Sequence, residues 1–386
     1  MIRKKLIRIT TIPLSLEKLI ENQPRFMSAH YDVTLISSEK PKLEKLGQAQ
    51  GVNTYHVEMT RQITPLADLK SVWKLYRYFK KEKPFIVHSH TPKAGIVSML
   101  AAKLAGVPHR LHTVAGLPLL EAVGTKRKIL NFVEKLTYSA ATFVYPNSYG
   151  LLEIIKEHRF APPSKLKVLA NGSSNGINVS WFSRVHFSED DNYQLKTRLN
   201  ILPEHFVFIF VGRLVKDKGI NELIAAFVEL HNQFPNVRLL LVGNYEHELD
   251  PLQPETVSTI DSSDFIIPVG FQQDVRPYFA ISDALVFPTY REGFPNGVLQ
   301  AAAMDLPCIV TNINGCNEII TDGHNGMIIP VKDQAAVFEA MRRLYSDKNL
   351  YIAMRNVARE IIVSRYGQQY VWESILNEYK NLEAHV

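Results

Sequence analysis

The sequence predicts an α/β protein made of two doubly wound domains, each with a parallel sheet covered by helices. Short apolar, strand-like runs alternate with helix-like stretches through the whole chain, which is typical of βαβ units. The alternation restarts after a polar stretch near the middle of the chain. The 386 residues are 46% hydrophobic and 21% charged, which is enough apolar material for two cores.

In the first half, each expected strand is an apolar run, and a helix-like stretch follows it. We expect strands at 6–10, 33–36, 54–57, 85–88, 110–112 and 143–145. We expect helices near 14–27, 41–50, 66–82, 92–105, 124–140 and 147–158. Ligands of such sheets bind beyond the carboxyl ends of the strands, so the residues that follow the strands are the candidate site residues.

A domain boundary is expected within 171–190, where the loop-forming run Asn171–Gly176 is followed by the polar, acidic loop Ser188–Asn192. We place the two domains at 1–185 and 186–365. The second half repeats the alternation, with strands at 206–211, 238–242, 265–267, 284–287, 308–311 and 327–329. Its helices are expected near 217–232, 274–281, 296–304, 333–346, 348–364 and 368–384.

The net charge of +6 hides an uneven distribution. Residues 1–185 hold 28 Lys/Arg against 12 Asp/Glu, whereas residues 186–386 hold 16 against 26. A basic half indicates an anionic partner, for which nucleic acid and an anionic membrane both qualify; the alternative is a solvated surface without a partner.

Cysteine usage and hydropathy indicate the kind of compartment. Cys308 and Cys316 have no metal-binding spacing and fit a reduced cytosolic protein, with a disulfide as the alternative. No apolar run approaches about 18 residues, so we expect no transmembrane helix. The basic, then apolar N-terminus is interpreted as the first strand and not as a signal peptide.

The stretch Arg291–Thr311 reads as a strand end, a loop, a helix and a new strand. The loop is shaped by Gly293, Pro295 and Gly297. A loop of this kind gathers free backbone N–H groups at the positive end of a helix, which suits a diphosphate. Glu292 lies at its mouth and Gln300 in the helix. The alternative is an ordinary crossover in which Gly and Pro only shape the turn.

The stretch Gly212–Gly219 also follows a strand and enters a helix. It is neither G-x-G-x-x-G nor a Walker A loop. It supplies two cations, Arg213 and Lys218, that can hold phosphate oxygens; the alternative is a solvated surface loop. Because this loop and the Glu292 loop both follow strands of one predicted sheet, both can face one ligand. The segment Phe271–Arg276 is a candidate for contacting a nucleobase through its backbone.

In their order along the chain, these motifs resemble the donor half of the retaining glycosyltransferases of family 4, which have the GT-B fold. The matching segments are Gly212-Arg213, Lys218-Gly219, Glu292-Gly-Phe-Pro-Asn296, Gln300-Ala301 and Gly315 with Glu318. The resemblance runs over most of the chain. It implies two Rossmann-like domains facing across a cleft, the first binding the acceptor and the second the nucleotide-sugar. It also implies a C-terminal helix within 366–386 that crosses back to the first domain.

The resemblance also implies roles for the donor-side residues. Arg213 and Lys218 bind the donor diphosphate and stabilise the leaving group, and Glu292 contacts the donor sugar. The family's second glutamate, which contacts the ribose, is replaced by Gln300, whose amide still donates and accepts hydrogen bonds. The remaining donor-binding residues are Gly212, Gly293, Phe294, Pro295, Asn296, Gly297 and Val298. Glu318 is either a ligand or a helix N-terminal charge. We expect no cofactor and no metal.

Two motifs in the first half, His88–Gly95 and His112–Pro118, follow strands. In the family, a histidine at the position of His112 lies close to the anomeric carbon, so His112 is implied as a catalytic residue; a buried structural histidine is the alternative. His90 is a second candidate. Two histidines at i, i+2 without a third ligand do not indicate a metal site. The remaining acceptor-side candidates are Thr11, Lys93 and Gly116. The first loop, 10–15, lacks the glycines usual in the family, which indicates a subgroup with its own acceptor loop.

We therefore predict a retaining glycosyltransferase that moves a sugar from a UDP-sugar, such as a UDP-N-acetylhexosamine, to a polyprenyl-diphosphate-linked saccharide in surface polysaccharide or glycan biosynthesis. Two basic helices, 69–83 with aromatic residues and 126–135, indicate docking on an anionic membrane, although part of the aromatic set must face the core. We expect a cytoplasmic protein at the inner face of the membrane, without nucleic acid as a partner. The alternatives are a GT-B sugar-nucleotide epimerase, a basic nucleic-acid-binding protein, and an inactive scaffold, at which only Gln300 hints.

Overall fold

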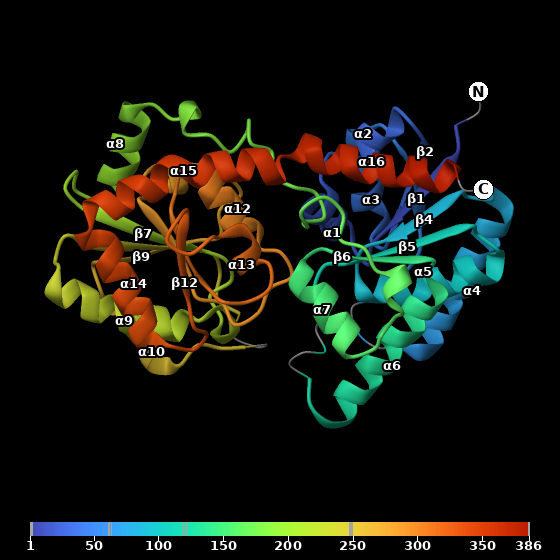
Figure 1. Ribbon diagram of the computed structural model, residues 1–386, viewed down its shortest axis with the longest axis horizontal. Coiled ribbons are helices and arrows are strands. Elements are labelled where there is room, and N and C mark those ends of the chain that lie inside the picture. The colour runs from blue at the N-terminus through green and yellow to red at the C-terminus, as the bar shows by residue number, and fades with distance from the viewer. Residues whose placement is uncertain are drawn as a thin grey trace. The chain divides into compact units, whose positions relative to one another are not determined.

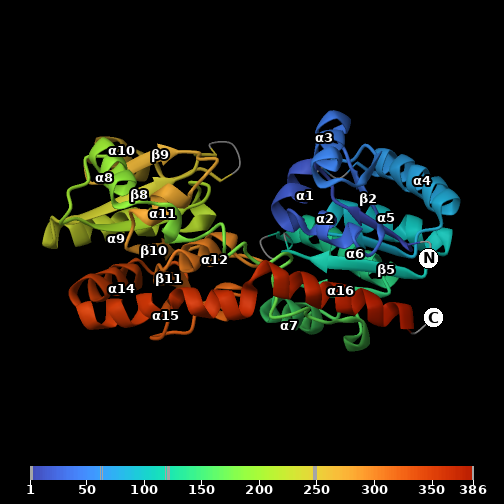
Figure 2. The same ribbon diagram turned by 90° about the horizontal axis from the view of Figure 1, so that it is seen from above.

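The computed structural model describes residues 3–60, 62, 64–117, 119, 122–246 and 250–384. The chain divides into two compact units: residues 1–176 with 368–386 form the first unit, and residues 177–367 form the second. Each unit is built on one six-stranded parallel sheet with helices packed on it (Figure 1, Figure 2). The division comes earlier than the predicted boundary at 185/186. Already at Ile177 the chain is tied into the second unit, because its N–H donates to the carbonyl of Tyr366 at 2.8 Å.

The first sheet has the strand order β3-β2-β1-β4-β5-β6. Its strands are β1 (Lys5–Ile9), β2 (Asp32–Ser37), β3 (Asn53–His56), β4 (Ile86–Ser89), β5 (His109–Val114) and β6 (Phe143–Pro146). All of the pairs are parallel. The order reverses between β1 and β4, so the loops after β1, β4 and β5 meet at one edge of the sheet.

The helices of the first unit cover both faces of this sheet. They are α1 (Pro13–Ile20), α2 (Gln23–Ser28), α3 (Lys40–Gln50), α4 (Pro65–Glu82), α5 (Pro92–Ala105), α6 (Gly124–Ala140), α7 (Tyr149–Glu157) and α16 (Gln368–Ala384), with a 3₁₀ turn at Pro163–Lys165. The last helix, α16, belongs to this unit (Figure 1). Its side chains Val371, Ile375 and Tyr379 pack against residues of β1, β4, β5 and β6. The single helix predicted at 14–27 is two helices. The chain turns at Glu21, where φ is +26°, and Pro24 lies in the first turn of α2, where its missing N–H costs nothing.

The second sheet has the strand order β12-β11-β10-β7-β8-β9, and all of its pairs are parallel too. Its strands are β7 (Phe206–Val211), β8 (Val237–Val242), β9 (Ile266–Gly270), β10 (Ala284–Phe287), β11 (Cys308–Thr311) and β12 (Gly326–Ile329). Its helices are α8 (Glu189–Arg198), α9 (Ile220–Gln233), α10 (Pro254–Ser262), α11 (Arg276–Ala280), α12 (Asn296–Ala303), α13 (Cys316–Ile319), α14 (Gln334–Ser346) and α15 (Lys348–Tyr366), with 3₁₀ turns at Arg184–His186 and Lys216–Lys218.

The prediction of a loop at Ser188–Asn192 is wrong, because these residues cap and begin helix α8. Ser188 caps the helix, and its side chain accepts from the N–H of Asp191, whose carboxylate accepts from the N–H of Ser188 at 3.0 Å. A capping box of this kind stabilises a helix start without any apolar residue. No residue of α8 is buried, so the hydrophobic pattern that predicts helices is missing here.

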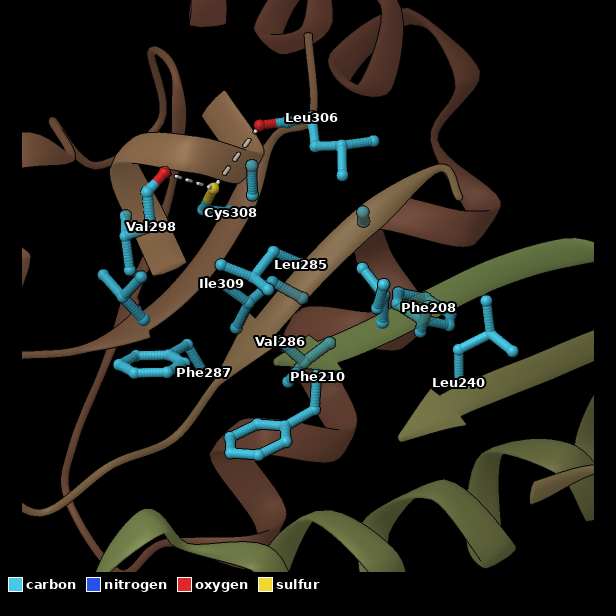
Figure 3. Packing of buried hydrophobic residues seen from close by; sticks show 14 of the residues in the cluster. Phe208, Phe210, Leu240, Leu285, Val286, Phe287, Val298, Leu306, Cys308 and Ile309 are labelled. Carbon is cyan, nitrogen blue, oxygen red and sulfur yellow. Dashed lines mark hydrogen bonds between the residues drawn. The ribbon is translucent and has the colours of Figure 1, made fainter. Parts of the chain in front are cut away.

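The core of the second unit lies between its sheet and the helices (Figure 3). Phe208 and Phe210 of β7 and Val286 of β10 are fully buried, as expected for strands covered on both faces. The two cysteines, Cys308 and Cys316, are free and buried, so the disulfide alternative is wrong. Burial raises the pKa of both thiols well above the ordinary value, which keeps them protonated.

Candidate active site

The donor-side candidates lie at the carboxyl edge of the second sheet. β7 and β10 are neighbouring strands, so the loops that follow them meet. Gly219, after the 3₁₀ turn Lys216–Lys218, has a φ of +69°, and a Cβ there would lie 2.1 Å from the carbonyl oxygen of Pro288. Only glycine permits so close an approach, and this approach brings Lys218 and Glu292 together.

Lys218 and Glu292 form an ion pair between their Nζ and Oε1 atoms, and both side chains are mostly buried, 14% and 17% exposed. Thr289 donates its hydroxyl to the same carboxylate oxygen at 3.3 Å. The main-chain carbonyl of Glu292 accepts from the amide of Asn314. The two residues predicted to hold one ligand therefore lie side by side.

Arg213 lies nearer the start of the same segment after β7 as Lys218, and it has a different partner. Its Nη1 is 2.5 Å from Oε2 of Glu246, and its side chain is 49% exposed. A Cβ at Gly243 would lie 1.8 Å from the carbonyl oxygen of Gly212, so the loops after β7 and β8 are in backbone contact. Arg213 thus presents a half-exposed guanidinium at the edge where Lys218 and Glu292 meet.

The loop after Glu292 leads into α12 in the expected way. Pro295 is the N-cap, and no side chain of the described residues caps the helix, so N–H groups of its first turn are left for another partner. Asn296 is exposed, and Gly293, Gly297 and Gln300 are partly exposed.

Several residues of the loop form its support. The side chains of Phe294 and Val298 belong to the hydrophobic core, where the ring of Phe294 lies 5.4 Å from that of Tyr366. Gly315, with a φ of +77°, lets the chain approach the carbonyl of Gly293. The carboxylate of Glu318 accepts from the N–H of Gly315 at 3.3 Å, so it acts here as a helix N-terminal charge.

In the first unit, His112 of β5 is buried and lies beside β4. Its Nδ1 is 2.8 Å from the hydroxyl oxygen of Ser89. Burial lowers the pKa of His112 to about 4, so the ring is neutral at pH 7. A neutral imidazole can accept or donate a hydrogen bond but carries no charge to a ligand.

His90 does not lie free at the end of β4. Its Nε2 accepts from Nε of Arg8 at 3.0 Å, and its ring lies 4.3 Å from that of His88. Nδ1 of His88 is 2.6 Å from the hydroxyl of Tyr379 on α16. Arg8 is fully buried in β1 and was not predicted as part of this cluster. Its only sequence signal is a charge inside an apolar strand.

The other acceptor-side candidates are tied to neighbouring elements. The hydroxyl oxygen of Thr11 is 2.8 Å from that of Thr91, which links the loops after β1 and β4. Lys93 pairs with Asp68 at 2.5 Å, which ties the start of α5 to the start of α4. At Gly116, φ is +159° and a Cβ would meet no atom within 4 Å. Pro118, the last residue of the second histidine motif, lies outside the described residues.

Within the described parts of the chain, no group of three or more His, Cys, Asp or Glu is arranged to hold a metal ion. The candidate residues fall into one set in each unit. The first unit carries His112, His90, Thr11, Lys93 and Gly116, and the second carries the cations, Glu292 and the loop into α12.

Gly95 of α5 leaves room for the ring of His112, and this gives a testable prediction. A Cβ at Gly95 would lie 2.5 Å from Cε1 and 2.9 Å from Nδ1 of His112. Alanine normally stabilises a helix interior relative to glycine by up to about 1 kcal/mol. We predict that Gly95→Ala instead destabilises the protein by about 1–3 kcal/mol, because the ring must move from Ser89. Thermal unfolding measures this, with the exposed Lys103→Ala of the same helix as control. A higher melting temperature for Gly95→Ala would contradict the packing.

Two family models match the chain. "Glycosyl transferases group 1" matches residues 205–347, and "Glycosyl transferase 4-like domain" matches residues 21–172. The capsular polysaccharide biosynthesis glycosyltransferase CapM of Staphylococcus aureus is 32% identical over 97% of this chain and 97% of its own. A UDP-Gal:alpha-D-GlcNAc-diphosphoundecaprenol alpha-1,3-galactosyltransferase of Escherichia coli is 30% identical over 86% of this chain and 84% of its own.

Among solved structures, Anabaena HepE in complex with UDP and glucose aligns with a TM-score of 0.79, at 16% identity, over 98% of this chain and 100% of its own. At this identity the likeness concerns the fold, and with the two six-stranded parallel sheets it confirms the predicted two-domain GT-B fold. The family models cover the two units in the predicted order. The chain therefore belongs to the group 1, family 4-like glycosyltransferases, and the protein is a glycosyltransferase.

Proposed function

We propose that the protein transfers a sugar from a nucleotide-diphosphate donor, a UDP-sugar, to a hydroxyl of a polyprenyl-diphosphate-linked saccharide, with retention of the anomeric configuration. The observation that carries the proposal is the contact of Lys218 with Glu292 beside a half-exposed Arg213. A cation suits the diphosphate and a carboxylate suits the sugar hydroxyls. The two relatives named above, one in capsule biosynthesis and one acting on a lipid-linked sugar, support the acceptor class and a role in surface polysaccharide biosynthesis.

In the proposed reaction, the main difficulty is the departure of the diphosphate. Arg213, Lys218 and the N-terminus of α12 neutralise the charge that develops on it. The ammonium of Lys218 leaves Glu292 for the phosphate oxygens, and the freed carboxylate accepts from the sugar. Gln300 holds the ribose hydroxyls through its amide. Family resemblance assigns His112 to the sugar, which it meets as a neutral ring. The leaving phosphate takes the proton of the acceptor hydroxyl on the same face.

The proposal is tested by a donor screen followed by product analysis. Thermal shifts with UDP-, GDP- and dTDP-sugars identify the donor. The selected donor and a synthetic polyprenyl-diphosphate saccharide are then incubated with the enzyme, and NMR gives the anomeric configuration of the product. We expect an α-linked product from an α-linked donor, at the same rate with EDTA because no metal takes part. An inverted product would refute retention, and a new nucleotide sugar formed without acceptor would favour the epimerase.

We further propose that the first unit docks on an anionic membrane through α4 and α6. On α4, Leu66 and Trp73 are 85% and 60% exposed, and Leu69 is exposed on the same face. On α6, Phe132 is 65% exposed. Exposed basic residues accompany them, namely Lys70, Lys74, Arg77, Lys80, Lys81, Lys126, Lys128 and Lys135. Apolar side chains flanked by Lys and Arg fit an anionic lipid surface. As expected, other aromatic residues of α4, such as Phe79, face the core.

No helix in the described part of the chain is long and apolar enough to span a bilayer, so the proposed docking is interfacial. We predict that Leu66→Ser/Leu69→Ser/Trp73→Ser lowers binding to vesicles with 30% anionic lipid by about tenfold or more, because each removed side chain gives up burial worth about 1 kcal/mol or more. Sedimentation with the vesicles measures this. The matched control is Val185→Ser/Leu202→Ser, two exposed apolar residues of the second unit. Equal binding of the triple variant and the control would refute the assignment of α4.

A further inference from the structure

Asp217 is a buried carboxylate between two lysines, in a turn that the sequence makes look solvated. The residue is only 7% exposed. Its Oδ2 accepts from Nη2 of Arg291 at 2.8 Å, whereas its Oδ1 is buried and has no hydrogen-bond partner among the described residues. Taking a carboxylate out of water costs free energy, and the attraction within one ion pair does not offset this cost in full. Stability alone therefore does not explain the burial of Asp217.

The main chain of Asp217 joins three loops. Its N–H donates to Oδ2 of Asp250, in the connection after β8, at 2.6 Å. Its carbonyl accepts from the N–H of Tyr290 at 2.8 Å, and the hydroxyl oxygen of Thr289 lies 3.3 Å from the same carbonyl oxygen. Together with the close approach of Gly219 and Pro288, these bonds lay the turn 216–219 directly against the segment 288–292.

Two ion pairs link these segments side by side. Asp217 pairs with Arg291, and Lys218 pairs with Glu292. The signs alternate on both segments. A slip by one residue would place Lys218 against Arg291, or Asp217 against Glu292, and like charges at contact distance repel. Only one register satisfies both pairs.

We propose that Asp217 and Arg291 are positioning residues, whose ion pair sets the register of the two loops and holds Nζ of Lys218 beside the carboxylate of Glu292. The inference rests on the proposed function, because the placement of Lys218 beside Glu292 matters for binding only if the ligand carries a diphosphate next to a sugar. Neither residue needs to touch the donor. Their effect reaches it through Lys218 and Glu292.

The first test measures donor binding and turnover. Arg291→Gln removes the charge at a partly exposed position, and Arg342→Gln is the matched control, because Arg342 pairs with Glu339 at 2.6 Å on the same unit with similar exposure. By calorimetry we expect Arg291→Gln to bind UDP about tenfold more weakly and to lose about tenfold in kcat, with the control unchanged. Arg291→Lys keeps the pair and is expected within about threefold of the wild type. Asp217→Asn/Arg291→Gln is expected to be no worse than either single variant, because both remove the same interaction.

The second test needs no donor. Urea unfolding of the wild type, Lys218→Met, Glu292→Gln and the double variant gives the coupling of Lys218 to Glu292. The coupling is the factor by which Lys218→Met changes the unfolding constant when Glu292 is present, divided by the same factor when Glu292 is replaced. We expect a ratio of about fivefold in the wild-type background and close to one in the Arg291→Gln background. An unchanged ratio, or additive effects of Asp217→Asn and Arg291→Gln, would overturn the positioning role. If the wild type binds no nucleotide diphosphate while the ratio changes as expected, the proposed function fails and the register inference stands.

Discussion

Replacing Arg213 by alanine is expected to lower turnover by about 10²–10³-fold while leaving the fold intact. The side chain is half exposed, and among the described residues its hydrogen-bonded partner is Glu246, so this ion pair contributes at most about 1 kcal/mol to stability. In the proposed reaction it neutralises charge that develops on the leaving diphosphate. Removing one such charge-stabilising group typically costs two to three powers of ten in rate.

Steady-state kinetics with the donor found in the screen measure this loss, and circular dichroism with thermal unfolding measures the fold. Arg342→Ala is the control, since Arg342 is an ion-paired arginine of the same unit and lies far along the chain from all candidate residues. Arg213→Lys keeps the charge but not the bidentate geometry, and we expect intermediate turnover. Turnover of Arg213→Ala within threefold of the wild type would sink the donor-side assignment.

The central strands were predictable because they are apolar runs buried on both faces of their sheets, such as β4, β7, β10 and β11. Phe206–Val211, Ala284–Phe287 and Cys308–Thr311 have the predicted bounds, and the other strands differ by a few residues at their ends. Helix α8 was missed for the opposite reason: it has no buried face, and its stability comes from caps and charges that a hydrophobic pattern does not register.

The positions of the candidate residues were predictable from the sheet, but their contacts were not. Residues after β7 and β10 had to meet at one edge, which placed Arg213, Lys218 and Glu292 near one another. Which cation meets which carboxylate depends on the approach of the loops, and that approach is set by Gly219 against Pro288. The pairing of Asp217 with Arg291 therefore has no signature in the sequence.

Partly buried arginines are the second kind of feature that sequence patterns miss. Arg184 donates to the carbonyls of Met304 at 2.7 Å, Ala280 at 2.9 Å and Ser282 at 2.7 Å. It thereby satisfies carbonyls at the ends of α11 and α12 that have no partner within the helices. In the sequence, Arg184 is one charge in a stretch of mixed apolar and polar residues. Its role follows from long-range packing alone.

The first unit is expected to lose stability steeply as the pH falls below 6.5, because it buries three neutral histidines. Burial is the main cause that lowers the pKa of all three histidines, His88, His90 and His112, and it lowers the pKa of His112 to about 4. The charge of Arg8 further lowers the pKa of His88 and His90. In the unfolded chain each titrates near 6.5. Below that pH the unfolded state binds more protons than the folded one, so the free energy of unfolding falls with pH. Each histidine contributes up to about 1.4 kcal/mol per pH unit.

Glu134 opposes part of this loss. Burial raises its pKa to about 7, so between pH 7 and its ordinary value the folded state holds a proton that the unfolded state lacks. That term stabilises the fold as the pH falls and offsets about one histidine. The net expectation between pH 6.5 and 4.5 is a loss of about 3 kcal/mol per pH unit from these four groups.

Urea unfolding at pH 7.5, 6.5, 5.5 and 4.5 measures how steeply the free energy of unfolding changes with pH. The unfolding is monitored by tryptophan fluorescence in a Trp181→Phe background, which leaves Trp73 and Trp372 of the first unit as reporters. The slope is linked to proton uptake, so a variant that removes one buried histidine must lower it by about 1.4 kcal/mol per pH unit, whatever it does to stability at neutral pH. His112→Gln is that variant, and the exposed His324→Gln is its control. If both variants keep the wild-type slope, protonation of His112 does not cause the loss of stability at low pH. The carboxylates elsewhere in the unit must then cause it.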